Sequence, residues 1–117
     1  MLMHEMSIVS NIMDVALQTA EEHNLAVIKK IKVKVGTQHH LAPDLMEYAF
    51  SFFKKNTVAA DAALEIEKVP VTMRCRQCRK VYPVDEGIYL CPDCESVNVE
   101  MITGRELIIE NIEGERK

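Results

Sequence analysis

The sequence predicts an α+β fold, with a three-stranded sheet, two packed helices and an inserted four-cysteine metal-binding ribbon. Three observations support this prediction. Two stretches carry apolar residues at helical spacing, three have the pattern of strands, and all four cysteines fall in one short stretch between the second and third strands. The element order is therefore helix, strand, helix, strand, ribbon, strand, which suits a small sheet with helices packed on it.

The two predicted helices have clear apolar faces. The first is expected from Ser7 to about Asn24, where Asn suits the end of a helix because it tolerates a left-handed backbone. The second begins at Pro43, which suits a first turn, and ends near residues 54–56. The apolar stripes comprise Ile8, Val9, Ile12, Met13, Ala16, Leu17 and Ala20 in the first helix, and Leu45, Met46, Ala49, Phe50 and Phe53 in the second.

Residues 28–35 alternate between apolar residues and the lysines Lys30, Lys32 and Lys34, which predicts a half-buried strand. The lysine row indicates a solvated sheet face or a guarded edge. Further strands are expected over 64–71 and 106–112, with a short ribbon strand over 97–102. We therefore expect one domain from residues 1–71, completed by 106–117, and a ribbon domain over 72–105.

The cysteines form two Cys-x2-Cys pairs, Cys75/Cys78 and Cys91/Cys94, separated by twelve residues. Two such turns can direct four thiolates at one point, which is the tetrahedral set that structural Zn²⁺ prefers. Disulfides would suit an exported protein, but the start of the chain lacks a signal-peptide pattern. A thioredoxin-like pair would need one motif opening a helix. Rubredoxin-type iron uses the same four thiolates and stays as the alternative metal.

The net charge, the cysteine count and the lengths of the apolar runs limit which functions are compatible with the sequence. The net charge is −4, so binding to nucleic acid would have to come from a local patch, and Arg74, Arg76, Arg79 and Lys80 offer one near the first cysteine pair. A zinc-ribbon module that binds nucleic acid or protein is thus the alternative function. Four cysteines leave no open position for a catalytic water, so we do not expect an enzyme. No apolar run approaches the length of a membrane span, and we expect a cytoplasmic protein.

The stretch Met3-His4-Glu5-Met6-Ser7, expected just ahead of the first helix, is a second candidate site. A histidine near a chain start can chelate through its imidazole and neighbouring backbone nitrogens, a planar nitrogen-rich geometry that suits Ni(II) or Cu(II). His39 and His40 are further candidates, although adjacent loop histidines seldom share one ion, and we expect an exposed loop. His23 is expected at a helix end.

Together, the Met-His-Glu start, the first helix, the strands and the two cysteine pairs resemble the HypA/HybF nickel metallochaperones of hydrogenase maturation. The resemblance covers nearly the whole chain. It implies that Ni(II) binds at His4 and the backbone nitrogens of Met3, His4 and Glu5. It also implies that structural zinc is held by Cys75, Cys78, Cys91 and Cys94. As partners it implies the GTPase HypB, the hydrogenase large subunit and, in some relatives, urease maturation proteins.

The chain departs from the family pattern in two places. The family's initiating methionine aligns with Met3, so Met1 and Leu2 form an extension that replaces a terminal amine by an amide, unless translation begins at Met3. Many relatives carry a histidine after the last cysteine, where this chain has Glu95. The resemblance therefore does not extend to a nickel or pH response that relatives owe to that histidine.

Overall fold

The computed structural model describes residues 2–84 and 89–117, and these form two compact units. The first unit holds the chain up to Lys34, together with Leu41–Glu67 and Ile108–Lys117. The second holds Val35–His40 and Lys68–Leu107. Met1, the other possible start of translation, lies outside the described residues.

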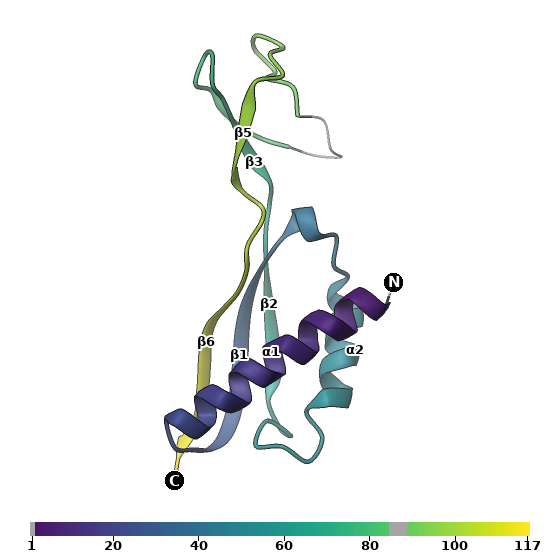
Figure 1. Ribbon diagram of the computed structural model, residues 1–117, viewed down its shortest axis with the longest axis vertical. Helices are drawn as coiled ribbons and strands as arrows, with labels where there is room; N and C mark the ends of the chain where they lie inside the picture. Colours follow the sequence, from purple (N-terminus) through teal and green to yellow (C-terminus); the bar gives the residue numbers. More distant parts are fainter. Residues whose placement is uncertain (1, 85–88) are drawn as a thin grey trace. The chain divides into compact units, whose positions relative to one another are not determined.

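Two helices and a three-stranded sheet build the first unit, which confirms the predicted fold class (Figure 1). The central strand of the sheet is β1, with β2 and β6 on its two sides. The elements are α1 (Leu2–Glu22), β1 (Leu25–Gly36), α2 (Pro43–Phe53), β2 (Ala63–Val69) and β6 (Leu107–Arg116). None of the helices in the described part of the chain is long and apolar enough to span a bilayer.

The core of this unit lies between the helices and one face of the sheet. Both predicted helical stripes contribute to it, and β1 supplies the alternate residues of its apolar face. The buried members are Val9, Ile12, Met13, Ala16 and Ala20 of α1, Ile28, Ile31 and Val33 of β1, and Met46, Ala49 and Phe50 of α2. Asn24 follows α1 with φ 56°, as expected for a residue that ends a helix in the left-handed region.

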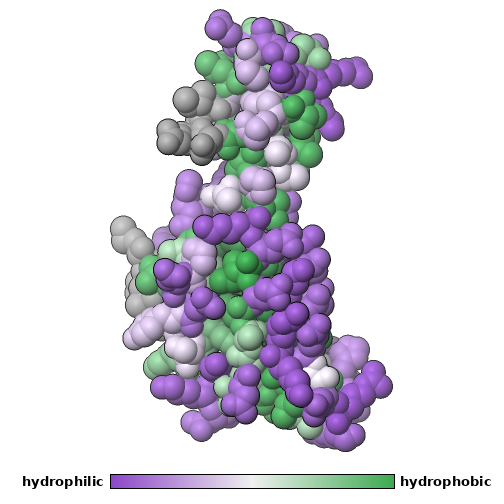
Figure 2. All heavy atoms as spheres, turned by 180° about the vertical axis from the view of Figure 1, so that it is seen from behind, coloured by the Kyte–Doolittle hydropathy of each residue, from purple (hydrophilic) through white to green (hydrophobic). Residues whose placement is uncertain are grey.

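The lysines of β1 lie on the other face of the sheet, where glutamates of both neighbouring strands pair with them. Lys30 Nζ lies 3.2 Å from Glu65 of β2, and Lys32 Nζ lies 3.3 Å from Glu110 of β6. These ion pairs raise the pKa of both lysines. Because β1 is central, the lysine row is a solvated sheet face and not a guarded edge. Hydrophilic side chains are abundant in the rear view, on the side where β6 lies (Figure 2).

The start of α1 was predicted wrongly. The helix begins at Leu2, not Ser7, so the Met-His-Glu stretch forms its first turn and does not precede it. Met and Glu are good helix formers, so these residues can extend the helix. Glu5 lies on the buried face of this added turn and is nearly fully buried, whereas the buried face had been expected to begin with the apolar residues after Ser7. A polar residue on the buried face masked the continuation of the helical pattern toward the chain start.

A second three-stranded sheet, ordered β4-β3-β5, builds the other unit. The strands are β3 (Thr72–Cys75), β4 (Val81–Pro83) and β5 (Val99–Thr103), and β3 pairs antiparallel with both neighbours. The predicted strand over 64–71 stops at Val69, because Pro70 lacks the N–H that would continue the ladder. A small core consists of Val71, Met73, Cys75, Tyr82 and Cys91, with Val84, Val99 and Met101 packed against it.

Two glycines allow the chain to cross closely within the second unit. A Cβ on Gly36 would overlap the carbonyl of Gly104, and Gly104 itself has φ +117°, which side chains rarely adopt. The Gly36 N–H donates to the Glu106 carbonyl at 2.6 Å, and the Gln38 N–H donates to the Gly104 carbonyl at 3.1 Å. These contacts position the short 3-10 helix η1 (Thr37–His39) beside residues 104–106.

Candidate metal centre

The four cysteines converge on one point in the second unit. All four sulfurs lie within 4.8 Å of one another, and Cys75 to Cys94 and Cys78 to Cys91 are each 3.5 Å apart. A tetrahedron with zinc–sulfur bonds of about 2.3 Å requires sulfurs roughly 3.8 Å apart. The cysteines are free thiols, and these separations are far longer than the roughly 2 Å of a disulfide. The arrangement therefore fits a single four-thiolate metal ion.

The two cysteine turns have the same backbone geometry. In the first, the Arg79 N–H donates to the Cys75 carbonyl at 2.9 Å; in the second, the Glu95 N–H donates to the Cys91 carbonyl at 2.9 Å. Arg79 and Glu95 are both left-handed, with φ of 63° and 59°. The Cys75 N–H donates to the Lys80 carbonyl at 2.9 Å, and the Cys91 N–H donates to the Ser96 carbonyl at 3.1 Å. Sequence reasoning missed the conformation of Arg79 and Glu95, because neither is a Gly or Asn.

Backbone amides tune the thiols unequally. The N–H of Cys78 lowers the pKa of the buried Cys75 thiol to about 6, and the N–H of Cys94 lowers the pKa of Cys91. The exposed Cys94 behaves oppositely: the Ser96 N–H lowers its pKa, but the nearby Cys75 sulfur and desolvation raise it to about 12. The raised pKa values of Cys78 and Cys94 oppose formation of their thiolates, and the positive charge of a metal ion offsets this cost.

The basic residues around the first cysteine turn are engaged by local carboxylates. Arg74 and Arg76 both lie near Glu100, at 3.4 and 3.8 Å. Lys80 Nζ lies 3.1 Å from Asp93, which links the first cysteine turn to the second. The positive charges thus remain close to the thiolates, while three of them are shared with neighbouring acids.

The N-terminal candidate site belongs to the first unit. His4 is exposed in the first turn of α1, whereas the neighbouring Glu5 is only 2% exposed. Glu5 Oε2 accepts a hydrogen bond from the Ala42 N–H at 2.9 Å, and this bond lowers the pKa of Glu5. Ala42 is the N-cap residue of α2 and has no capping side chain of its own. Glu5 of α1 therefore stabilises the start of α2, and its carboxylate does not face the solvent beside His4.

The sequence contained one signal for this role of Glu5. The N-cap residue of α2 is Ala42, and its N3 residue is Leu45, which cannot accept a hydrogen bond from the N-cap amide as the Glu or Gln of a capping box does. The Ala42 N–H was therefore open to an acceptor from elsewhere in the chain. The partner is 37 residues away in sequence, which local patterns do not identify.

The other histidines are not members of the cysteine cluster. His39 and His40 are exposed, as predicted, but His39 Nε2 donates to the Arg105 carbonyl at 2.8 Å, and His40 has a left-handed backbone. His23 is exposed just after α1. Within residues 2–84 and 89–117, the only cluster of three or more His, Cys, Asp or Glu side chains that could hold a metal is the cysteine tetrad.

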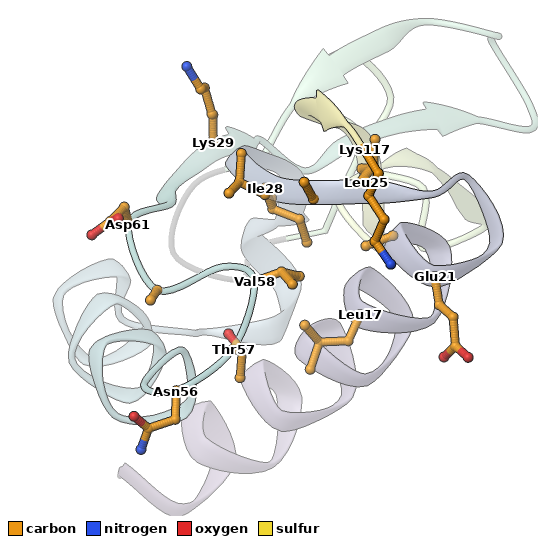
Figure 3. Close-up of a pocket in the computed structure, with 14 residues that line it drawn as sticks. Leu17, Glu21, Leu25, Ile28, Lys29, Asn56, Thr57, Val58, Asp61 and Lys117 are labelled. Carbon is orange, nitrogen blue, oxygen red and sulfur yellow. The ribbon is translucent and has the colours of Figure 1, made fainter.

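A groove with a volume of ≈ 880 Å³ lies in the first unit between the end of α1, the start of β1 and residues 56–61 (Figure 3). Its hydrophobic wall includes Leu17, Ile28 and Val58, which point toward one another, while Glu21 and Asp61 point away from the centre. The charged groups do not converge on a point, so the groove lacks the paired acids and bases of a catalytic site.

Comparison with known proteins gives a consistent family. The family model described as "Hydrogenase/urease nickel incorporation, metallochaperone, hypA" matches residues 3–114. The hydrogenase maturation factor HypA of Desulfitobacterium hafniense is 34% identical over 113 residues, covering 97% of this chain and 99% of its own length. The factor of the same name from Moorella thermoacetica is 35% identical over 113 residues, covering 97% of this chain and all of its own.

Solved structures agree in fold. The solution structure of the Ni metallochaperone HypA from Helicobacter pylori has a TM-score of 0.69 at 25% identity and covers 97% of this chain and 98% of its own. A second solution structure, described as HypA protein, has a TM-score of 0.73 at 27% identity, with 98% of each chain covered.

Proposed function

The chain belongs to the HypA family of metallochaperones, which are maturation factors and not enzymes, and on that premise we propose that it delivers Ni(II) for assembly of the [NiFe]-hydrogenase active site. Its four cysteines hold a structural Zn²⁺ in this proposal. The observation that carries it is the family match over residues 3–114 combined with an exposed His4 in the first turn of α1.

The proposed nickel ligands are the His4 imidazole and backbone nitrogens of Met3, His4 and Glu5. The first N–H groups of a helix lack intrahelical acceptors, so nitrogens of Met3 and His4 are available without breaking the body of α1. Planar nitrogen ligation suits Ni(II). The Glu5 carboxylate is buried and bonded to Ala42, so Glu5 contributes its backbone nitrogen and anchors the turn.

The two sites have the properties that delivery requires. A site at an exposed helix start, with one side-chain ligand, lets a partner compete for the ion. The four-thiolate centre, with Cys75 and Cys91 buried, retains its metal. We propose that the partners are the GTPase HypB and the hydrogenase large subunit, with urease maturation proteins as further recipients, all in the cytoplasm.

Binding of nucleic acid by the ribbon is the weaker alternative. Arg74, Arg76 and Lys80 are engaged with Glu100 and Asp93, so phosphate would have to displace three ion pairs. The overall negative charge opposes such binding as well.

The deciding experiment is a calorimetric nickel titration of the zinc-loaded protein and of His4→Ala. We expect His4→Ala to lose stoichiometric Ni(II) binding while keeping its zinc content and helical circular dichroism, because His4 is exposed. The matched control is the double variant His39→Ala, His40→Ala, which should bind nickel like the parent. If the double variant loses nickel and His4→Ala does not, the nickel site belongs to η1 and the proposal is wrong.

A further inference from the structure

A second groove of the first unit lies between α1 and the last part of β6, and we call it the α1–β6 groove. Its volume of ≈ 480 Å³ falls within the range of about 300–1,000 Å³ that is usual for ligand pockets. The apolar residues that line it are Val15, Leu25, Ile109 and Ile112. Val15 is 51% exposed and the other three are half-buried, so the groove presents aliphatic surface to a ligand.

The polar residues of the α1–β6 groove are Thr19, His23, Asn111 and Arg116, and no carboxylate lines it. Each of these side chains can donate a hydrogen bond, and Arg116 also carries a positive charge. In the part of the chain that the structure describes, no hydrogen bond or ion pair joins any of the four side chains to another residue. The groove therefore combines an aliphatic lining with donors that are free to bind an anion.

Backbone hydrogen bonds fix the end of the groove where its basic residues lie. The His23 N–H donates to the Thr19 carbonyl at 3.0 Å, and the Lys117 N–H donates to the Asn24 carbonyl at 2.9 Å. The second bond holds the end of β6 beside the end of α1. Because Arg116 and His23 each precede a partner of that bond, they lie at the same end of the groove before any ligand binds.

The charge of Arg116 is left free by its neighbours. Glu115 pairs with Lys29 at 2.7 Å, and successive side chains of a strand point to opposite faces, so Arg116 points to the face that carries the groove. Glu22, the last residue of α1, accepts a hydrogen bond from Gln18 at 3.3 Å and does not line the groove. An acidic ligand would thus supply Arg116 with a partner that the described residues do not.

The position of β6 indicates what kind of ligand fits. The sheet order is β2-β1-β6, so β6 is an edge strand among the described residues (Figure 1). The outer backbone groups of an edge strand can pair with an added extended chain. Every second side chain of that chain would lie on the face of the sheet that carries the groove. An aliphatic side chain suits the apolar lining, and an acidic one suits Arg116 and His23.

We propose that the α1–β6 groove docks an extended segment of a partner protein that carries aliphatic and acidic side chains at every second position. This inference goes beyond metal delivery, and its test does not depend on nickel. Helix α1 has 21 residues, which at about 1.5 Å per residue places its two ends roughly 30 Å apart. A segment bound at the end of α1 therefore leaves His4, in the first turn, uncovered.

The test is a titration of the zinc-loaded, ¹⁵N-labelled protein with a blocked octapeptide in which leucine and glutamate alternate at every second position, with threonine between them. We expect backbone amide shifts over residues 109–116 and at the end of α1, with a dissociation constant on the order of 100 µM. The matched peptide, with lysine in place of glutamate, should bind at least about tenfold more weakly. Absence of binding, shifts confined to other residues, or equal binding of the two peptides overturns the proposal.

Two neighbouring residues supply a matched pair of variants. Arg116→Glu should weaken binding of the acidic peptide at least about tenfold. Lys117→Glu makes the same change in net charge, but Lys117 lines the groove of Figure 3 and not the α1–β6 groove, so its affinity should stay within about twofold of the parent. Circular dichroism and zinc content establish that both variants are folded, and both should bind nickel like the parent. If the two variants weaken binding equally, the attraction is one of overall charge and the groove is not the docking site.

Discussion

The buried carboxylate of Glu5 gives the sharpest test of how α1 and α2 are joined. Replacing Glu5 by alanine removes the acceptor of the Ala42 N–H at 2.9 Å and leaves that amide without its partner. A hydrogen bond to a charged group contributes about 1.5–3 kcal/mol. The second oxygen, Oε1, is buried and has no hydrogen-bond partner among the described residues, so its removal offsets part of the loss.

The net destabilisation expected for Glu5→Ala is about 2 kcal/mol, which for a domain of this size lowers the melting temperature by about 10 °C. Glu5→Gln keeps an acceptor of the same shape and should lose about 1 kcal/mol. Urea unfolding at pH 7, followed by helical circular dichroism, measures both changes. The matched control is Glu21→Ala, an exposed glutamate on the same helix, which should change stability by less than about 0.5 kcal/mol.

The pH dependence of the folding stability tests the role of Glu5 independently. The Ala42 N–H lowers the folded-state pKa of Glu5 below the ordinary value of 4.5. Its stabilisation is therefore fully present above pH 4.5 and is lost as the pH falls through the folded-state pKa. The stability difference between the parent and Glu5→Gln should shrink below pH 4.5, and zinc release at acid pH affects both proteins alike. If Glu5→Ala is as stable as Glu21→Ala at pH 7, the hydrogen bond from Ala42 to Glu5 does not stabilise the packing of α1 against α2.

Three further predictions concern the metals. Cys91→Ser should lose bound zinc and unfold the second unit, measured by elemental analysis and by proteolysis between residues 72 and 105, because an open tetrad no longer organises the ribbon; red, iron-containing parent protein would contradict the zinc assignment. Zinc binding to the metal-free protein at pH 7 should release protons, because the thiols of Cys78 and Cys94 have raised pKa values and must ionise to bind the metal; calorimetry in buffers of different ionisation enthalpy counts them, and no proton release would refute the assignment. A chain that begins at Met3 should bind Ni(II) more tightly than the full chain, because it offers a primary amine in register with His4; equal affinity in parallel titrations would exclude that amine as a ligand.

Much of the fold could be predicted because its patterns are local. The alternation of apolar residues and lysines determines which face of β1 is buried, and the glutamates that pair with those lysines also alternate, as Glu65 does with Leu64. The cysteine spacing likewise indicates a tetrad without knowledge of the rest of the chain. Such features depend on residues that are close in sequence, or on chemistry that has few alternatives.

The parts that escaped prediction depend on distant contacts. The strand β4 has only three residues and is defined by pairing with β3, for example Tyr82 opposite Met73. The strand β6 continues to Arg116, beyond the predicted end at 112, where Lys29 of β1 pairs with Glu115 at 2.7 Å. Neither contact leaves a periodic pattern in the sequence. A charged residue at a helix face, such as Glu5, is assigned to solvent by any pattern rule until its partner is known.

The proposed function requires one chain to keep one metal and to release another, and the two candidate sites differ in structure. The cysteine tetrad is held by two turns of equal geometry and by the Lys80–Asp93 pair between them, so loss of one ligand disturbs a closed set of contacts. His4, by contrast, lies in a first helical turn whose amides have no intrahelical acceptors, and the next residue is fixed by its bond to Ala42. If nickel binds as proposed, we expect rearrangement of the turn only in the residues that precede the Glu5 side chain's bond to Ala42. The proposal therefore predicts that nickel is bound and released by changes in a few backbone torsions, while the helical circular dichroism of α1 stays the same.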